Sequence, residues 1–381
     1  MMTMRGRIVL PGGIIPDGVV QVRGDRITAV GPATDFPEGG IPDASDDLIL
    51  PGLVDLHCHG GGGASFPDAA NRAEAMVAVL EHRRHGTTTL VASLVTAPPQ
   101  RLRDQVGLLA TLAAAGEIAG IHLEGPFISA AHRGAQDPDA ITAPDPGLTE
   151  ELARLADGHL VSMTIAPECP GAVEVATRLL GHGAFPSWGH TSATAAEAAA
   201  TLRAVGEGHA TVTHLYNGMA PLHHRQPGPI LEFLAAARQG RLTVELIGDG
   251  VHLDPATVRA TVEIVGPDNA VLVTDAMAGA GMADGDYQLG GHAVAVRDGV
   301  ARLADGGALA GGTAHLLDVV RATVAGGVPL VDAVSMASAV PARLLGRGDI
   351  GVLAVDMRAD ILVTDTDLAV KGVFRHGVLV R

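Results

Sequence analysis

Short apolar runs alternate with Ala-rich stretches of helical spacing through most of this 381-residue chain, starting near residue 51. Eight runs rich in Val, Ile, Leu and Thr predict buried strands at 53–57, 87–94, 118–124, 160–166, 184–190, 210–216, 243–250 and 270–276. Helical stretches lie between them at 70–85, 99–115, 147–156, 172–181, 193–205, 228–239 and 255–264. Eight strand–helix units with right-handed crossovers predict an α/β fold closed into a (β/α)8 TIM barrel. An open doubly wound sheet is the alternative that the pattern leaves open.

The sequence pattern at the two ends of the chain differs from that of the central part. Residues 1–50 and 347–381 contain short strands separated by turns, and two further helices are predicted at 313–325 and 330–344. We therefore expect a small β-sandwich domain built from both termini. The barrel, residues 51–346, would be inserted between its two halves.

Composition excludes several classes of protein. Although 47% of residues are hydrophobic, no apolar run of about 18 residues occurs, which argues against a membrane span. Pro11 interrupts the apolar N-terminal stretch and no small-residue cleavage site follows, so a signal peptide is not expected. The net charge of −16 argues against nucleic-acid and anionic membrane partners.

The cysteine and lysine counts narrow the chemistry further. Two cysteines, Cys58 and Cys169, give no disulfide framework, so we expect a cytoplasmic protein. Lys371 is the single lysine, which removes Schiff-base chemistry, a P-loop and a carbamylated lysine from the body of the chain.

Polar residues gather where the predicted strands end. The side chains at or just beyond these C-terminal ends are His57, His59, Glu124, His190, His214, His252 and Asp275. In parallel barrels this rim carries the active site, because the loops that follow the strands converge on one mouth. One such histidine alone would be an ordinary solvated or core residue, but the set together predicts a metal site.

The ligand types fit a borderline divalent ion. Glu124, His190 and His214 would supply the three protein ligands of a catalytic zinc site, which also holds a water. His57 and His59 alternate along a strand, so both should face the barrel axis and form a second metal site. Most H-x-H tripeptides bind nothing, and it is the position at a strand end that favours ligation here. Cys58 should point outward and serve in packing.

Asp275 closes the last, strongly apolar strand. A carboxylate there needs a metal or a substrate to bond, and we predict that it moves a proton from metal-activated water to a leaving nitrogen. A salt bridge or a helix N-cap is the structural alternative. The Gly-rich stretch 277–285 that follows suits a loop over the mouth.

Six segments then carry a specific resemblance: HLEGPF (122–127), WGHT (188–191), VTHLYNGM (212–219), HHRQPGP (223–229), DGVH (249–252) and LVTDAM (272–277). In this order and on these strand ends they closely resemble the N-acetylglucosamine-6-phosphate deacetylases of the amidohydrolase superfamily. The resemblance covers essentially the whole chain. H-x-H with a final Asp marks only the superfamily, whereas HLEGP with THLYN and the HHR-x-PG loop is specific to the family.

The resemblance implies roles for individual residues. Its main-metal ligands match Glu124, His190 and His214, the second-ion ligands of some members match His57 and His59, and the catalytic acid/base matches Asp275. Zinc leads the expected divalent metals, with Fe2+, Co2+ and Mn2+ as alternatives and one or two ions per subunit.

The resemblance also implies how substrate is held. His252 matches a substrate-binding histidine, and Asn217 with the backbone of Gly218 would help to hold a sugar phosphate. Arg225 matches an arginine that grips this phosphate from the neighbouring subunit of a homodimer. Charge supports this reading, since an acidic protein needs a local basic cluster for a phosphate. Without the resemblance, a solvated loop explains Arg225 equally well.

Gln136 is a departure from the family pattern. In HRGAQDP (132–138) the family usually has a histidine at this position, which polarises the scissile carbonyl or orients the sugar. Glutamine donates a hydrogen bond but carries no charge. Gln136 therefore either substitutes as a donor in substrate binding or changes which sugar is accepted.

The expected function is hydrolytic deacetylation of N-acetylglucosamine 6-phosphate to glucosamine 6-phosphate and acetate by metal-activated water. The same chemistry on N-acetylgalactosamine 6-phosphate is an alternative, as is an amidohydrolase acting on another amide. A barrel that has lost its chemistry and serves as a binding protein is a different class of alternative. The presence of every main-site ligand argues against that last reading.

Overall fold

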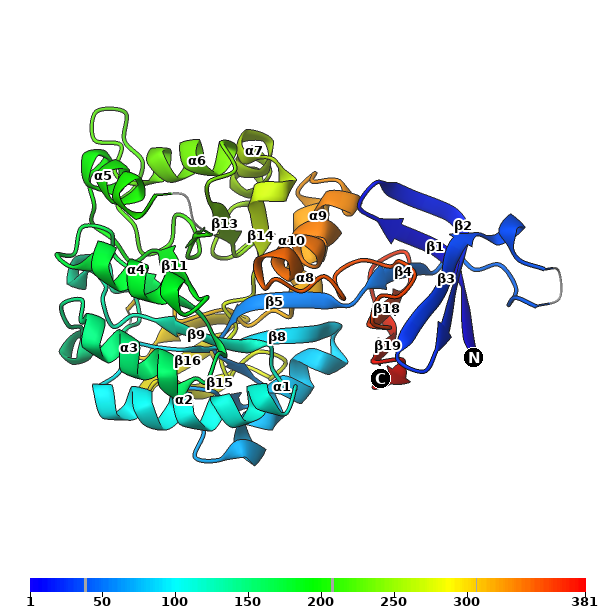
Figure 1. Cartoon of the computed structure of the whole chain (residues 1–381), viewed down its shortest axis with the longest axis horizontal. Helices are drawn as coiled ribbons and strands as arrows, with labels where there is room; N and C mark the ends of the chain where they lie inside the picture. Colours follow the sequence, from blue (N-terminus) through cyan, green and yellow to red (C-terminus); the bar gives the residue numbers. More distant parts are fainter. Residues whose placement is uncertain (38–39, 207–208, 306) are drawn as a thin grey trace.

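The computed structural model describes residues 1–37, 40–206, 209–305 and 307–381. In these residues a parallel sheet follows the chain order predicted for a barrel, and Figure 1 shows it beside a smaller terminal sheet. Its strands are β5 (Leu53–Cys58), β8 (Thr87–Leu94), β9 (Gly120–Glu124), β10 (Leu160–Ile165), β11 (Phe185–Trp188), β12 (Thr211–Val212), β13 (Thr243–Leu246) and β14 (Ala270–Leu272). The predicted strands are confirmed, although the last four are shorter than expected.

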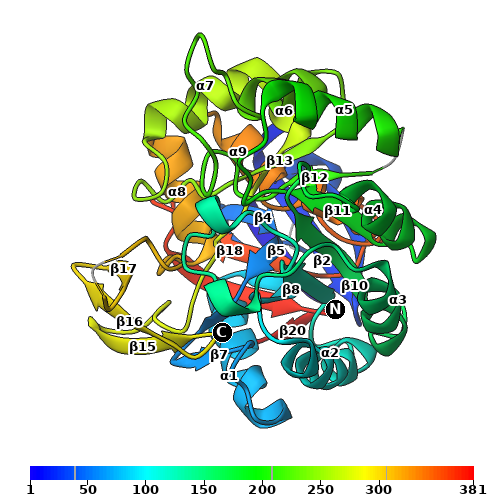
Figure 2. The ribbon, with the colours of Figure 1, turned by 90° about the vertical axis from the view of Figure 1, so that its left-hand side faces the viewer.

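Helices surround these strands, as Figure 2 shows from the side at which the strands end. They are α1 (Arg72–Arg84), α2 (Pro99–Ala114), α3 (Pro146–Leu155), α4 (Ala172–Gly181), α5 (Ala195–Val205), α6 (Ile230–Arg238), α7 (Pro255–Val265) and α8 (Leu316–Ala325). Local signals fix the starts of α5 and α7: Thr194 and Glu197 form a capping box at α5, and Asp254 caps α7 ahead of Pro255. No helix in the described residues is long and apolar enough to span a membrane.

Hydrogen bonds between the first and last barrel strands bring the barrel close to complete closure. Asp275 N–H donates to the His57 carbonyl at 2.9 Å, and His59 N–H donates to the Ala276 carbonyl at 2.7 Å. The buried carboxylate of Asp55 accepts the Thr274 hydroxyl at 2.6 Å across the same seam. These contacts place the ends of β5 and β14 side by side.

The predicted helix 330–344 is in fact two helices, α9 (Leu330–Met336) and α10 (Ala339–Leu344). Pro341 has no N–H to donate to the Ala337 carbonyl, so a continuous helix cannot form there. That carbonyl instead accepts the Val54 N–H of β5 at 2.9 Å. The break therefore ties this helical segment to the first barrel strand.

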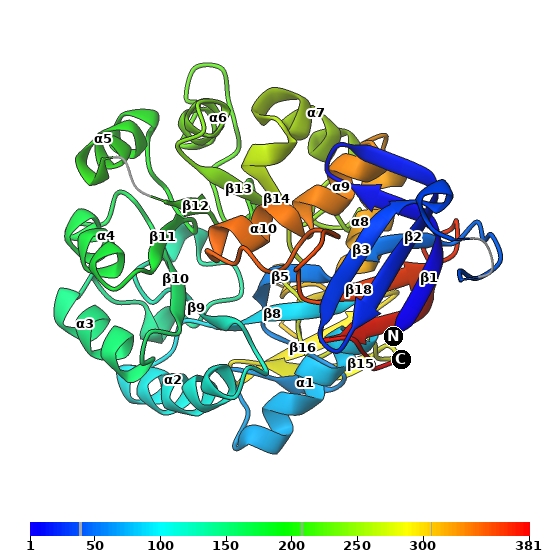
Figure 3. The same cartoon turned by 45° about the vertical axis from the view of Figure 1, so that its right-hand side comes forward.

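Both termini contribute to the smaller sheet. Its order is β20-β19-β18-β4-β1-β2-β3. The strands are β1 (Met2–Leu10), β2 (Gly13–Arg23), β3 (Arg26–Pro32), β4 (Leu48–Pro51), β18 (Ile361–Thr364), β19 (Val370–Arg375) and β20 (Val378–Leu379). Figure 3 shows this sheet with α9 next to it, and both ends of the chain belong to it. The strands expected to form the small terminal domain belong to one continuous sheet, because β4 pairs with β1 on one side and with β18 on the other.

A small antiparallel sheet lies between Asp275 and α8, where only a loop was expected. Its strands are β15 (Gly285–Leu289), β16 (His292–Arg297) and β17 (Val300–Leu303), and a two-strand pairing of β6 (Gly60–Gly61) with β7 (Ala64–Ser65) follows β5. Arg297 pairs with Val300 around Asp298 and Gly299, both with positive φ. An Asp-Gly pair between alternating apolar residues is a strong hairpin signal, so this element was detectable from the sequence.

Candidate active site

Glu124 lies at the centre of the ligand-type side chains at the barrel mouth. Its Oε1 is 2.8 Å from His214 Nε2 and 3.0 Å from His190 Nε2, and those two nitrogens are 3.1 Å apart. All three side chains are at most 6% exposed. The structure thus brings together the three residues predicted as the main metal site.

His57, His59 and Asp275 form a second group against the same carboxylate. His57 Nε2 is 3.0 Å from His59 Nε2, and Asp275 Oδ1 is 3.4 Å and 3.2 Å from these two nitrogens. Glu124 Oε2 lies 3.1 Å from His59 Nε2. Cys58 points the other way, with Sγ 3.3 Å from His82 of α1, as expected for a packing residue.

The Nδ1 atoms of three histidines are held by acceptors. His190 Nδ1 lies 2.8 Å from the His132 carbonyl, and His59 Nδ1 lies 3.2 Å from the Ser93 carbonyl. His57 Nδ1 lies 3.1 Å from the Glu245 carboxylate. An imidazole that donates from Nδ1 presents the Nε2 lone pair, so these contacts select the tautomer that ligates a cation through Nε2.

Electrostatics at this centre favour a cation. Burial opposes ionisation of Glu124, but the charges of His190 and His57 and the hydrogen bonds from His190 and His214 together outweigh it and hold the pKa of Glu124 well below its usual range. Burial likewise opposes ionisation of Asp275, yet the His57 charge and a His59 hydrogen bond lower the pKa of Asp275 to about 2. For His57, burial lowers the pKa but Asp275 and Glu124 raise it to about 10. Two buried carboxylates therefore stay ionised and need positive charge beside them.

Three of these residues have left-handed backbone conformations. The φ angles are 45° for His190, 26° for His214 and 49° for Asp275. Such backbone costs about 1–3 kcal/mol at a non-glycine residue and persists only where surrounding contacts enforce it. The three residues follow the ends of β11, β12 and β14, so the chain turns sharply just as it delivers each side chain to the centre.

A cavity of about 200 Å³ opens onto this centre. The predicted site residues that line it are His59, Glu124, Gln136, His190, His214, Asn217, Gly218, His252 and Asp275. Leu289 of β15 and Leu309 add an apolar wall that sequence reasoning missed. His57 is fully buried and does not line the cavity, but it contacts His59 and Asp275, which do.

Gln136 has both ends of its side chain engaged. Its Oε1 accepts the Thr96 backbone N–H at 2.7 Å, and its Nε2 donates to Glu124 Oε2 at 2.6 Å. One N–H of the amide remains. The side chain predicted to bind substrate thus first of all supports a ligand-type carboxylate.

The residues predicted to hold substrate are placed differently from one another. His252 lines the cavity with Nδ1 2.8 Å from Asp249, so its Nε2 is free for a ligand. Asn217 Nδ2 donates to the His214 carbonyl at 3.2 Å. Arg225 is exposed in a loop, with Nη1 2.7 Å from His224 Nε2, and does not line the cavity of its own chain.

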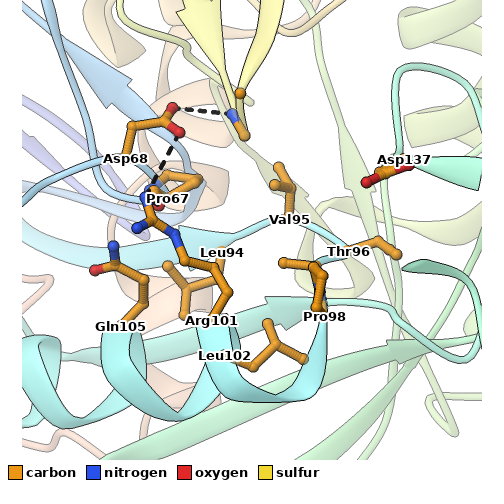
Figure 4. Close-up of a pocket in the computed structure, with 13 residues that line it drawn as sticks. Pro67, Asp68, Leu94, Val95, Thr96, Pro98, Arg101, Leu102, Gln105 and Asp137 are labelled. Atoms are coloured by element: carbon orange, nitrogen blue, oxygen red, sulfur yellow. Dashed lines mark hydrogen bonds and ion pairs between the residues drawn. The ribbon is translucent and has the colours of Figure 1, made fainter. Parts of the chain in front are cut away.

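A second cavity of about 180 Å³ lies beside the end of β8 (Figure 4). Asp68 accepts the Gly290 N–H at 2.9 Å there and lies 3.8 Å from Arg101 Nη2, which ties the β15–β16 turn to the barrel. The wall includes Thr96, whose N–H holds Gln136. This cavity therefore lies next to Thr96, which holds Gln136 against Glu124, and the rest of its wall is mainly apolar.

Another histidine cluster lies outside the mouth. Glu81 Oε1 is 3.0 Å from His315 Nε2 and 3.3 Å from His85 Nδ1. The rings of His85 and His315 stack with centroids 3.7 Å apart and a 16° interplanar angle. Because imidazole lone pairs lie in the ring plane, two stacked rings do not converge on one ion. The barrel mouth remains the better metal centre.

Sequence reasoning missed several buried polar groups that support the mouth. Glu245 holds His57, Asp55 joins β5 to Thr274, and His122 bonds Ser93 and Thr164 across the barrel interior. Each is a polar residue with an apolar neighbour on both sides within a buried strand, and that position was the available signal.

Residues 48–380 match the amidohydrolase family. The crystal structure of N-acetyl-D-glucosamine-6-phosphate deacetylase from Mycobacterium smegmatis is 41% identical, with 100% of both chains covered and a TM-score of 0.93. A mutant of that enzyme has been solved in complex with N-acetyl-D-glucosamine-6-phosphate. The N-acetylglucosamine-6-phosphate deacetylase of Bacillus subtilis (strain 168) is 32% identical over 95% of this chain and 92% of the relative. The N-acetylgalactosamine-6-phosphate deacetylase of Escherichia coli O157:H7 is 31% identical over 98% and 97%.

Proposed function

Because the chain belongs to the N-acetylglucosamine-6-phosphate deacetylase family of amidohydrolases, we propose that it hydrolyses the acetamide of N-acetylglucosamine 6-phosphate. The products are glucosamine 6-phosphate and acetate. The convergence of Glu124, His190 and His214 beside the buried Asp275 is the observation that carries this proposal.

The residues at the mouth fit a divalent metal. The Nε2 atoms of His190 and His214 face each other at 3.1 Å and share Glu124 Oε1, a crowding of acceptors that a cation relieves. Glu124, His190 and His214 would hold the main ion, and His57 with His59 a second one. We favour Zn2+, since this mixed imidazole and carboxylate set suits it, over Fe2+, Co2+ or Mn2+. Such an ion activates water and withdraws charge from an amide carbonyl.

Asp275 is the proposed acid/base. Water adds to the acetamide carbonyl carbon, the carbon–nitrogen bond breaks, and Asp275 carries the proton from water to the leaving nitrogen. Its carboxylate is buried, lines the cavity and is held near His57 and His59. Its low pKa leaves it ionised and able to accept a proton at neutral pH.

Substrate contacts follow from the cavity wall. The remaining N–H of Gln136 and the free Nε2 of His252 face groups of the sugar or its acetamide, while Asn217 and the Gly218 backbone help to hold the phosphate. Arg225 completes the phosphate site from the neighbouring subunit of a homodimer. Its exposure, and its absence from the cavity of its own chain, support this arrangement.

The galactosamine epimer is the alternative substrate, and the similarity to an N-acetylgalactosamine-6-phosphate deacetylase supports it at nearly the same identity. The cellular setting we propose is the cytoplasm, since both cysteines are free thiols and a reducing compartment keeps them so.

The test is acetate release by the purified zinc-loaded protein from both epimeric N-acetylamino-sugar 6-phosphates. A cyclic imide and an N-acyl amino acid serve as controls for other amidohydrolase reactions. We expect turnover of the gluco epimer above the galacto epimer and none of the controls. Preference for a control amide would contradict the proposal, and preference for the galacto epimer would select the alternative.

A further inference from the structure

Glu245 is a buried carboxylate that contacts His57, and neither of these two residues lines the cavity. It ends no strand but lies within β13, flanked by Val244 and Leu246, and is 3% exposed. Its Oε2 is 3.1 Å from His57 Nδ1 and 3.2 Å from the His214 backbone nitrogen, which donates to it. One buried oxygen therefore contacts a residue of each predicted metal group.

This contact differs from the other Nδ1 contacts at the mouth. His190 and His59 donate from Nδ1 to the neutral carbonyls of His132 and Ser93, whereas His57 faces a carboxylate. A carboxylate behind a ligating imidazole fixes its orientation and increases its basicity more than a carbonyl does. His57 is thus the ligand whose binding strength depends most on a side chain outside the cavity.

The negative charge of Glu245 beside His57 affects how many cations the mouth can hold. Two divalent ions at the mouth would repel each other, and Glu124 and Asp275 supply two negative charges to offset them. A third buried carboxylate next to His57 lowers the cost of a second cation there. Its contact with the main group is through the backbone of His214, so it leaves the side-chain ligand atoms of that group unchanged.

We propose that Glu245 is a positioning residue that determines whether the His57/His59 site holds an ion, and so whether this chain binds one ion or two. It does so by presenting His57 Nε2 toward Asp275 and by balancing the added charge. This inference rests on the metal centre of the proposed function and deepens it.

The experiment removes the charge and keeps the shape. Glu245→Gln retains an acceptor for both N–H groups, and Glu263→Gln on α7, whose side chain is 71% exposed, is the matched control. Protein stripped with a chelator is titrated with zinc against a competing chelator, and bound zinc is measured by elemental analysis. We expect two equivalents for the wild type and the control. In Glu245→Gln the tighter site should be unchanged and the second weakened by roughly 10- to 100-fold.

Two further measurements keep the inference falsifiable if that variant does not fold. Glu245→Asp keeps the charge at shorter reach and should bind the second zinc with intermediate affinity. A crystal structure of the zinc-loaded wild type should show His57 ligating through Nε2 with Nδ1 on Glu245. Ligation through Nδ1, direct ligation by Glu245, or equal second-site affinity in wild type and Glu245→Gln would overturn it.

The outcomes separate this inference from the proposed function. A wild type that binds one equivalent overturns the role of Glu245 but leaves a one-ion deacetylase intact. Conversely, a protein that binds two ions in a Glu245-dependent way and releases no acetate from any amino-sugar phosphate retains the inference and refutes the function.

Discussion

Gln136 donates a hydrogen bond to Glu124 across the wall of the active-site cavity, from Nε2 to Oε2 at 2.6 Å. The Thr96 backbone fixes the other end of the amide, so the donor cannot turn away without losing a second hydrogen bond. Gln136 therefore orients the carboxylate shared by both predicted metal groups. One N–H of the Gln136 amide remains for a ligand.

The first prediction tests this support. Gln136→Met keeps the length of the side chain but removes the donor, so we expect zinc to bind the main site roughly 10- to 100-fold more weakly. Zinc affinity is measured by chelator competition. Gln136→His, which restores a donor, should bind zinc more tightly than Gln136→Met. Unchanged affinity in the methionine variant would contradict a supporting role.

The second prediction concerns Asp275 in the chemical step. Asp275→Asn keeps the shape of the side chain but removes the base, so kcat should fall by about 10²- to 10⁴-fold while KM changes little. Zinc content must be measured in the same preparation, because Asp275 also lies 3.2 Å from His59 Nε2. Near-normal kcat in the fully metallated variant would move the proton transfer to another group, with His252 next.

The third prediction concerns the number of ions. Changing His57 to Gln and His59 to Asn removes two imidazoles that face Asp275 but leaves Glu124, His190 and His214 in place. The double variant should retain one equivalent of zinc and appreciable activity. Elemental analysis and circular dichroism are the measurements. Loss of all metal together with the fold would show that the second group is not separable.

The fourth prediction concerns phosphate recognition by Arg225. Arg225→Ala should raise KM for the phosphorylated sugar far more than for the unphosphorylated sugar. A charge-assisted bidentate contact is worth roughly 2–3 kcal/mol, or about 30- to 150-fold. Sedimentation should show a dimer. Equal KM changes on both substrates would remove Arg225 from the phosphate site, and a fully active monomer would refute sharing between subunits.

The fifth prediction concerns stability against pH. Burial lowers the pKa of His82 to about 4, and its Nε2 donates to the Gly60 carbonyl at 2.8 Å. The pKa of a histidine in an unfolded chain is about 6.5. Between about pH 4 and about pH 6.5, His82 therefore binds a proton in the unfolded chain but not in the folded protein. The contribution of His82 is therefore complete above about pH 6.5 and is lost as the pH falls toward about 4.

His82→Gln keeps a donor for Gly60 but does not titrate. Between about pH 7.5 and about pH 5 the wild type should lose about 2 kcal/mol more unfolding free energy than this variant. Urea unfolding at a series of pH values measures the difference. Parallel pH profiles for the two proteins would contradict the assignment of this pH dependence to His82.

Several predictions from sequence depended only on local rules and are confirmed. The alternation of strand and helix predicted the barrel because each buried strand needs a covering helix, and period and length distinguish the two elements. The exceptions have local causes. Pro341 divides a predicted helix, and the Asp298-Gly299 turn marks a small sheet that was taken for a loop.

The sequence by itself determined which ligand-type side chains at the strand ends reach the mouth, because parallel strands place their carboxyl ends on one rim and the residue at each end is fixed by chain order. Only the tertiary structure decided how those side chains are held. Glu245 meets His57 across 188 positions, and Gln136 meets both Thr96 and Glu124. Such contacts depend on the register and twist of neighbouring strands, which bring distant residues within hydrogen-bond distance and leave no periodic trace in the sequence.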